Sequence, residues 1–164
     1  MEASTDADKW RIKLTRFLKR LGIIVLDPTK PCFENQVHES KKDREWVKEL
    51  RAAEEFAQLS RYMREIVRKD LRMIDAADFV IFNIEPDKPT WGTVHELVVA
   101  LLGRKPVLIL VPERKRLPLW LFGLVDLGTV FESEKDLKEM LAAINSHEGY
   151  LDPKRWKLFA KDYR

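Results

Sequence analysis

Apolar residues recur at helical spacing in the first half of the chain and form short continuous runs in the second half. Residues 8–21 have one apolar face, which predicts an amphipathic helix that ends at Gly22. Residues 40–60 and 61–77 predict two further helices, of which the first is mostly exposed. The apolar face of the first consists of Trp46, Leu50, Ala53 and Phe56. The apolar face of the second consists of Met63, Ile66, Val67, Leu71 and Ile74.

Short apolar runs predict buried strands at 23–27, 78–84 and 106–111. Because the run at 78–84 is nearly continuous, both faces of that strand are expected to be covered, as in a parallel sheet. A helix over 92–103 joins the second strand to the third, so this βαβ unit is expected to be right-handed. The remaining predicted elements are a strand at 129–131, a helix at 132–146 capped by Ser133, and a short helix at 156–163. Together these elements predict an open, doubly wound α/β sheet that is mostly parallel.

The composition fits one soluble globular domain over residues 1–164, with 45% hydrophobic and 35% charged residues. The net charge of +3 is mild and no block of like charge is long, which argues against a nucleic-acid polymer as partner. The single cysteine, Cys32, excludes an internal disulfide and fits a cytoplasmic location. The longest apolar runs, 97–102 and 107–111, are too short to span a membrane.

The sequence suggests no metal and no redox cofactor. The histidines do not have metal-ligand spacing, and the chain has neither a GxGxxG motif nor a Walker loop. The sequence therefore has none of the usual motifs for binding a dinucleotide or a nucleoside triphosphate.

The end of the strand at 78–84 is the predicted position of a ligand site, because open α/β sheets bind ligands beyond the carboxyl ends of their strands. Gly92, at the start of the next helix, would let the backbone approach a ligand closely. Glu96 stands in the first turns of that helix, where the dipole favours an ionised carboxylate that can act as a nucleophile. The alternative interpretation is that Thr93 and Glu96 form a capping box.

Asp70 is the other candidate carboxylate. It lies four residues after Ile66 and four before Ile74, so it projects from the edge of an apolar stripe. An unpaired carboxylate is costly in such a place. A ligand-contacting role for Asp70 competes with two structural roles, a cap for a new helical turn and an ion pair with Arg68 or Arg72.

Two tryptophans near the candidate site also have alternative interpretations. Trp91 is expected either to stack on a base or, as is commoner for an aromatic residue before a helix, to pack in the core or in a hydrophobic staple. Trp10 and Arg11 are expected either to reach a ligand together or to form a packed Trp10 beside an exposed Arg11.

The stretch DLRMIDAADFVIFN at 70–83, followed by PTWGTVHELVVALLGRKPVLIL at 89–110, resembles the nucleoside 2-deoxyribosyltransferase family. Its pattern is an Asp before an I-x-x-A-D strand entry, then G-T-x-x-E opening a helix, then K-P-V entering the next strand. The V-L-D-P at 25–28 is also similar, and the resemblance runs from about Glu2 to Phe131. It implies a flavodoxin- or Rossmann-like fold.

The usual first strand of that family is expected to be missing here, because the start of the chain looks like the end of the loop that follows it. Three explanations are open: a start placed too late, a fragment, or direct pairing of 23–27 with 78–84.

The resemblance also implies roles for single residues. Glu96 matches the glutamate that attacks C1′ of the deoxyribose and forms a covalent glycosyl-enzyme, and Asp70 matches the aspartate that assists proton transfer at the base. Where the transferases commonly have an acid, this chain has Thr90. A hydroxyl residue there is similar to relatives that cleave nucleoside 5′-monophosphates, in which it helps to hold phosphate.

The resulting hypothesis is an enzyme that cleaves the N-glycosidic bond of 2′-deoxynucleosides or their monophosphates and transfers the deoxyribosyl group to another nucleobase. The expected substrate contacts are Thr90, Asn83, Gly92, Trp91 and Arg11. The alternatives are a nucleoside 5′-monophosphate N-glycosidase, which is a hydrolase, and a nucleotide-binding module without catalysis. A homo-oligomer is expected, assembled through the apolar face of residues 46–56.

Overall fold

The computed structural model describes residues 4–30, 41–87 and 91–146 of the 164-residue chain. The chain divides into two compact units. The first unit comprises residues 1–25 and 78–164, and the second unit comprises residues 26–77. Each unit has its own helices, and the expectation that the whole chain is one domain stays a prediction.

The first unit is built on an open sheet of three parallel strands in the order β1–β2–β3. β1 (Val80–Asn83) pairs with β2 (Val107–Leu110), which also pairs with β3 (Val130–Phe131). α4 (Trp91–Leu102) connects β1 to β2 and contacts both strands, as a βαβ unit requires. The predicted α/β class is confirmed, and the parallel sheet is consistent with a flavodoxin-like fold.

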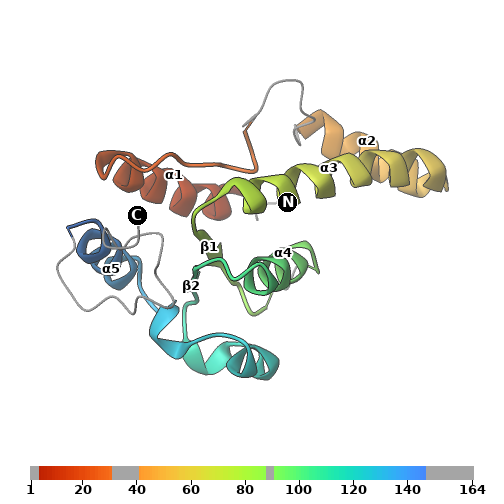
Figure 1. Ribbon diagram of the computed structural model, residues 1–164. Coiled ribbons are helices and arrows are strands. Elements are labelled where there is room, and N and C mark those ends of the chain that lie inside the picture. The colour runs from red at the N-terminus through yellow and green to blue at the C-terminus, as the bar shows by residue number, and fades with distance from the viewer. Residues whose placement is uncertain (1–3, 31–40, 88–90, 147–164) are drawn as a thin grey trace. The chain divides into compact units, whose positions relative to one another are not determined.

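Helices cover both faces of this sheet. β2 is buried along its whole length, and its alternate residues point to opposite faces. On one face, Leu108 and Leu110 share a buried cluster with residues of α1 (Ser4–Arg20) and α5 (Glu134–Ser146). α4 covers the other face, so that β1 and β2 lie between α4 and α5 (Figure 1).

The predicted strand at 23–27 is not formed. Ile23 and Val25 pack against the buried cluster, whereas Ile24 between them is 88% exposed. Packing against the cluster accounts for Ile23 and Val25, but a strand also needs the hydrogen bonds of a ladder. Within the described part of the chain the sheet consists of β1, β2 and β3. Of the three explanations for the missing first strand, direct pairing of this segment with 78–84 is therefore wrong.

The second unit contains α2 (Lys41–Ala52) and α3 (Phe56–Ala76), and the break between them differs from the prediction. Glu54 has a φ of 58°, and the N–H groups of Glu54 and Glu55 donate to carbonyls of the preceding turn at 3.3 and 2.9 Å. This is a Schellman motif, which usually has glycine at the left-handed position. Because a glutamate occupies that position here, the sequence carries no stop signal, and the predicted continuous helix over 40–60 is wrong.

The buried side of α3 is also rotated from the predicted stripe. Its buried residues are Ile66, Lys69, Met73 and Ile74. Met63 and Val67, which were predicted to belong to the stripe, are 38% and 42% exposed. Lys69 therefore occupies a core position, which a search for apolar periodicity does not detect.

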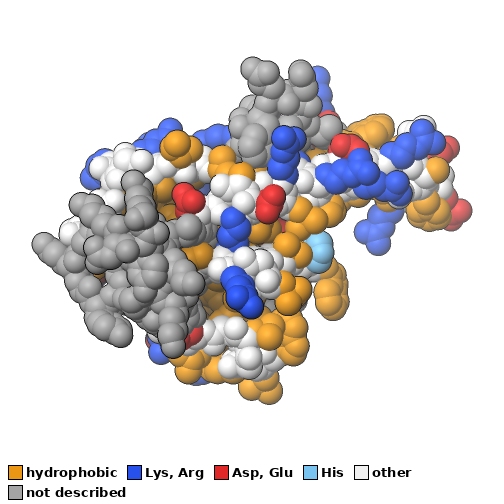
Figure 2. All heavy atoms as spheres, viewed as in Figure 1, with side chains coloured by type: hydrophobic (Ala, Val, Ile, Leu, Met, Phe, Trp, Pro, Cys, Tyr) orange, Lys and Arg blue, Asp and Glu red, His pale blue; other side chains and the backbone are white. Residues whose placement is uncertain are grey.

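The apolar face predicted at residues 46–56 is partly used inside the second unit. Leu50 is buried, and Trp46 packs edge-on against Tyr62 with ring centroids 5.2 Å apart. Phe56 is 59% exposed. Lysine and arginine side chains cover much of the visible surface of α2 and α3 (Figure 2). The assembly of copies of the chain through this face stays a prediction.

Short 3-10 helices follow β2, and the sequence did not predict them. They are η1 (Arg114–Arg116), η2 (Leu119–Gly123) and η3 (Leu127–Thr129). Leu117, Leu121 and Val125 are buried and hold this segment against the unit, although each turn is too short to show helical periodicity.

α5 begins as the sequence predicts. The side-chain oxygen of Ser133 accepts a hydrogen bond from the N–H of Asp136 at 3.2 Å, which confirms the predicted cap. The predicted helix at 156–163 lies outside the described residues.

Candidate active site

Asn83 and the start of α4 lie at the carboxyl end of β1, the edge at which parallel α/β sheets bind ligands. Asn83 is the last residue of β1, is half-buried, and pairs in register with Leu110. One residue further on, the N–H of Ile84 donates to the carbonyl of Leu110 at 2.8 Å. These contacts fix the backbone at the point where the chain leaves the sheet.

Glu96 projects from the second turn of α4 and is half-buried. A Cβ atom at Gly92 would stand 4.0 Å from Oε1 of Glu96, so the carboxylate turns back along the helix over the glycine. Residues four apart lie on the same helix face, which explains this proximity. The adjacent Leu97 is fully buried and anchors α4. The carboxylate thus lies near the positive end of the helix dipole.

The capping-box interpretation of Thr93 and Glu96 is wrong. A capping box needs the threonine at the residue before the first helical turn. α4 already begins at Trp91, so Thr93 lies inside that turn.

Trp91 is the first residue of α4 and is 90% exposed. The interpretation of Trp91 as a core residue is therefore wrong. An exposed indole at the carboxyl edge of a sheet can stack on a planar ligand. The predicted contact of Trp91 with substrate stays a prediction, as does that of the exposed Gly92 beside it.

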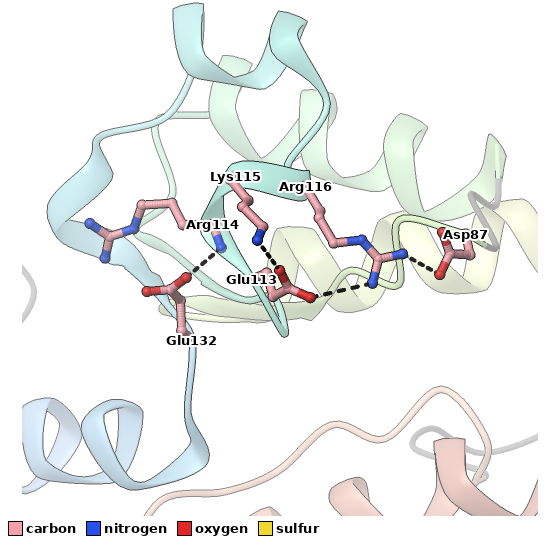
Figure 3. Close-up of polar contacts among 6 residues, drawn as sticks. All are labelled: Asp87, Glu113, Arg114, Lys115, Arg116 and Glu132. Carbon is pink, nitrogen blue, oxygen red and sulfur yellow. Dashed lines mark hydrogen bonds and ion pairs between the residues drawn. The ribbon is translucent and has the colours of Figure 1, made fainter.

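Charged residues join the loop after β1 to the segment after β2 (Figure 3). Arg116 of η1 donates a hydrogen bond to Asp87 and also lies 3.8 Å from Glu113. The hydrogen bond with Asp87 and its negative charge raise the pKa of Arg116 above its usual value. Glu113 in turn pairs with Lys115 at 2.9 Å. This set of contacts ties together the loops that leave the sheet at its carboxyl edge.

Arg114 links the same segment to β3. Its backbone N–H donates to Oε1 of Glu132 at 2.6 Å, and its guanidinium donates to the carbonyl of Val130 at 2.8 Å. No local sequence pattern marks this basic turn, because its partners, Glu132 and Val130, lie 16 to 18 residues away along the chain.

Asp70 belongs to the second unit, whereas Glu96 belongs to the first. Asp70 lies well inside the continuous helix α3, so its interpretation as a cap is wrong. Arg68 pairs with Glu65 at 2.9 Å. Asp70 forms an ion pair with Lys69, whose Nζ lies 3.5 Å from Oδ1. The predicted ion pair of Asp70 with Arg72 stays a prediction. That Asp70 and Glu96 share one site stays a prediction.

The sequence pattern that defines the nucleoside 2-deoxyribosyltransferase family matches residues 3–141, which include both candidate carboxylates. The chain belongs to this family. Membership in the nucleoside 2-deoxyribosyltransferase family supports a deoxyribosyltransferase-like enzyme with nucleoside substrates. Among curated proteins, none matches the chain.

The remaining predicted contacts of this deoxyribosyltransferase relative have different outcomes. The guanidinium of Arg11 lies over the ring of Trp10, 5.3 Å from its centroid, and Trp10 packs against the core cluster. The packed Trp10 is thus confirmed, but Arg11 is half-buried rather than exposed. Its contact with substrate stays a prediction. Thr90 lies outside the described residues.

The described residues contain no helix long and apolar enough to cross a membrane. Nor does the part of the chain that the structure describes contain three or more His, Cys, Asp or Glu side chains grouped to hold a metal ion.

Proposed function

We propose that this protein cleaves the N-glycosidic bond of 2′-deoxynucleosides or their 5′-monophosphates and transfers the deoxyribosyl group to another nucleobase, with Glu96 as nucleophile. The observation that carries this proposal is the position of Glu96, half-buried near the start of α4 and turned back over Gly92 at the carboxyl end of β1. The chain's membership in the deoxyribosyltransferase family supports this role for a carboxylate at that place.

In the proposed first step, a carboxylate oxygen of Glu96 attacks C1′ of the sugar while the bond from C1′ to the base breaks. The electron pair of that bond leaves with the base, which takes up a proton, and a glycosyl ester remains on Glu96. In the second step, an acceptor base loses an N–H proton and its nitrogen attacks C1′, which releases the carboxylate. This is the two-step logic of retaining glycosidases.

Asp70 is proposed to move the proton at the base in both steps, a contribution that is typically about 10²- to 10⁴-fold in rate. Asn83 and Gly92 are proposed to contact the substrate at the sheet edge, and Trp91 to stack on its base. Arg11 and Thr90 are proposed as further contacts, Thr90 with the 5′-phosphate.

The test is incubation with deoxynucleosides and their 5′-monophosphates, with and without an added acceptor base, followed by chromatography of bases and nucleosides. We expect a new nucleoside only when the acceptor base is present. Release of free base from monophosphates alone would instead identify a hydrolase. Release from no substrate would favour a nucleotide-binding module without catalysis.

Glu96→Ala is expected to abolish turnover while the protein stays folded. The matched control is Glu139→Ala, which removes an exposed carboxylate of α5 that pairs only weakly with Lys135 at 3.7 Å. Turnover by Glu96→Ala equal to that of the control would refute the assignment of the nucleophile.

A further inference from the structure

Lys69 is a buried cation that the proposed reaction does not yet use. Its side chain is 4% exposed, and it occupies the buried stripe of α3 with Ile66 and Met73. Lysine is almost never fully buried unless it is paired, because an isolated ammonium loses its hydration. The burial of Lys69 therefore calls for partners close to its ammonium.

Two oxygens lie beside the ammonium of Lys69. Nζ donates a hydrogen bond to the backbone carbonyl of Pro28 at 2.9 Å, and it lies 3.5 Å from Oδ1 of Asp70. The side chain of Asp70 is itself only 18% exposed. Adjacent residues on a helix do not normally face each other. The long stem of Lys69 overcomes this by packing in the stripe while its head reaches Asp70 at the edge.

Pro28 belongs to a turn that holds its own shape. Oδ1 of Asp27 accepts hydrogen bonds from the backbone N–H of Thr29 at 3.0 Å and from its hydroxyl at 2.7 Å. Asp27 is 9% exposed and also pairs with Lys30 at 3.5 Å. Lys69 thus connects Asp70 to this turn through the backbone carbonyl of Pro28.

We propose that Lys69 is a positioning residue for Asp70: it fixes the carboxylate beside the turn of residues 27–30 and favours its ionised form. This inference rests on the proposed function, in which Asp70 moves the proton at the base. An ammonium beside a carboxylate favours the charged carboxylate. Lys69 thereby sets the pH range over which Asp70 exchanges its proton.

The first test compares pH profiles of kcat/KM for base release by the full-length wild type and by Lys69→Met, which keeps the stem and removes the charge. We expect the limb that reports Asp70 to move to higher pH by about 1 unit or more in the variant. Lys69→Arg keeps the positive charge and is expected to keep the limb near its wild-type position. An unmoved limb in Lys69→Met would overturn the proposal.

The matched control is Arg68→Met, which removes the neighbouring cation. The side chain of Arg68 is 66% exposed and pairs with Glu65. We expect its pH profile to match that of the wild type. A shift equal to that of Lys69→Met would mean that general charge, rather than the contact with Asp70, controls the profile, and it would overturn the proposal.

A second measurement does not depend on activity or on the folding of Lys69→Met. Asp70→Asn leaves the buried ammonium beside a neutral amide, so its urea midpoint is expected to fall below that of Asp75→Asn, a change at an exposed residue of the same helix. Equal midpoints would overturn the ion pair and with it the proposal. Base release by no form of the protein would overturn the proposed function, while this comparison of midpoints would still test the contact.

Discussion

Gly92→Ala separates the demands of folding from those of catalysis at the candidate site. The added methyl would meet only Oε1 of Glu96, at 4.0 Å, which is an ordinary contact. Within a helix, alanine is more stable than glycine by about 0.5–1 kcal/mol. For a chain of this size 1 kcal/mol raises Tm by roughly 2–4 °C, so we expect a rise of about 1–4 °C. The fold therefore tolerates the methyl.

Catalysis is expected to respond in the opposite direction. The methyl would stand beside the proposed nucleophile and crowd the approach of C1′, so we expect kcat/KM for base release to fall at least about tenfold, or ~1.4 kcal/mol in barrier. The assay is steady-state base release together with thermal unfolding of the same sample. Gly123→Ala is the matched control, because a Cβ atom there meets nothing within 4 Å. A stable Gly92→Ala with wild-type kcat/KM would refute the placement of the reacting carbon beside Gly92.

Two further predictions concern the frame of the site. Leu97 is fully buried, so Leu97→Ala is expected to lower the free energy of unfolding, measured by urea titration, by about 2–5 kcal/mol. The control is Leu102→Ala, at an exposed residue of the same helix. A loss in Leu97→Ala no larger than that in the control would contradict the anchoring role of Leu97. Arg116→Ala and Asp87→Ala each remove one partner of the hydrogen bond between the loops, so we expect both to raise KM. We expect the double variant to be no worse than the more impaired single variant. Additive effects of the two changes would show that Arg116 and Asp87 act independently.

The elements around the site were predictable because their signals are local. The apolar runs of β1 and β2 and the helix between them follow from adjacent residues, as does the left-handed Gly22 after α1. The end of α2 was not predictable in this way, because Glu54 adopts the left-handed backbone conformation that glycine usually adopts at the end of a helix. The prediction of a strand at 23–27 was wrong because a strand needs a partner strand as well as apolar residues.

In the candidate site, too, some features were predictable from the sequence and others were not. The position of Glu96 near the start of a helix after a strand followed from spacing. The ion pair of Lys69 with Asp70 did not, because a charged residue at a stripe position looks like a gap in the apolar pattern. The contact between Arg116 and Asp87 joins residues far apart in the chain, and no local pattern encodes it.

The central claim, that Glu96 carries the sugar during the reaction, is tested most directly by trapping the intermediate. Wild type and Glu96→Gln would be incubated with a deoxynucleoside substrate without acceptor base, quenched in acid, digested, and analysed by mass spectrometry. The account predicts a deoxyribosyl group on the peptide that contains Glu96 in the wild type, and none in the variant. Base release by Glu96→Gln at the wild-type rate, or an adduct on another residue, would contradict it.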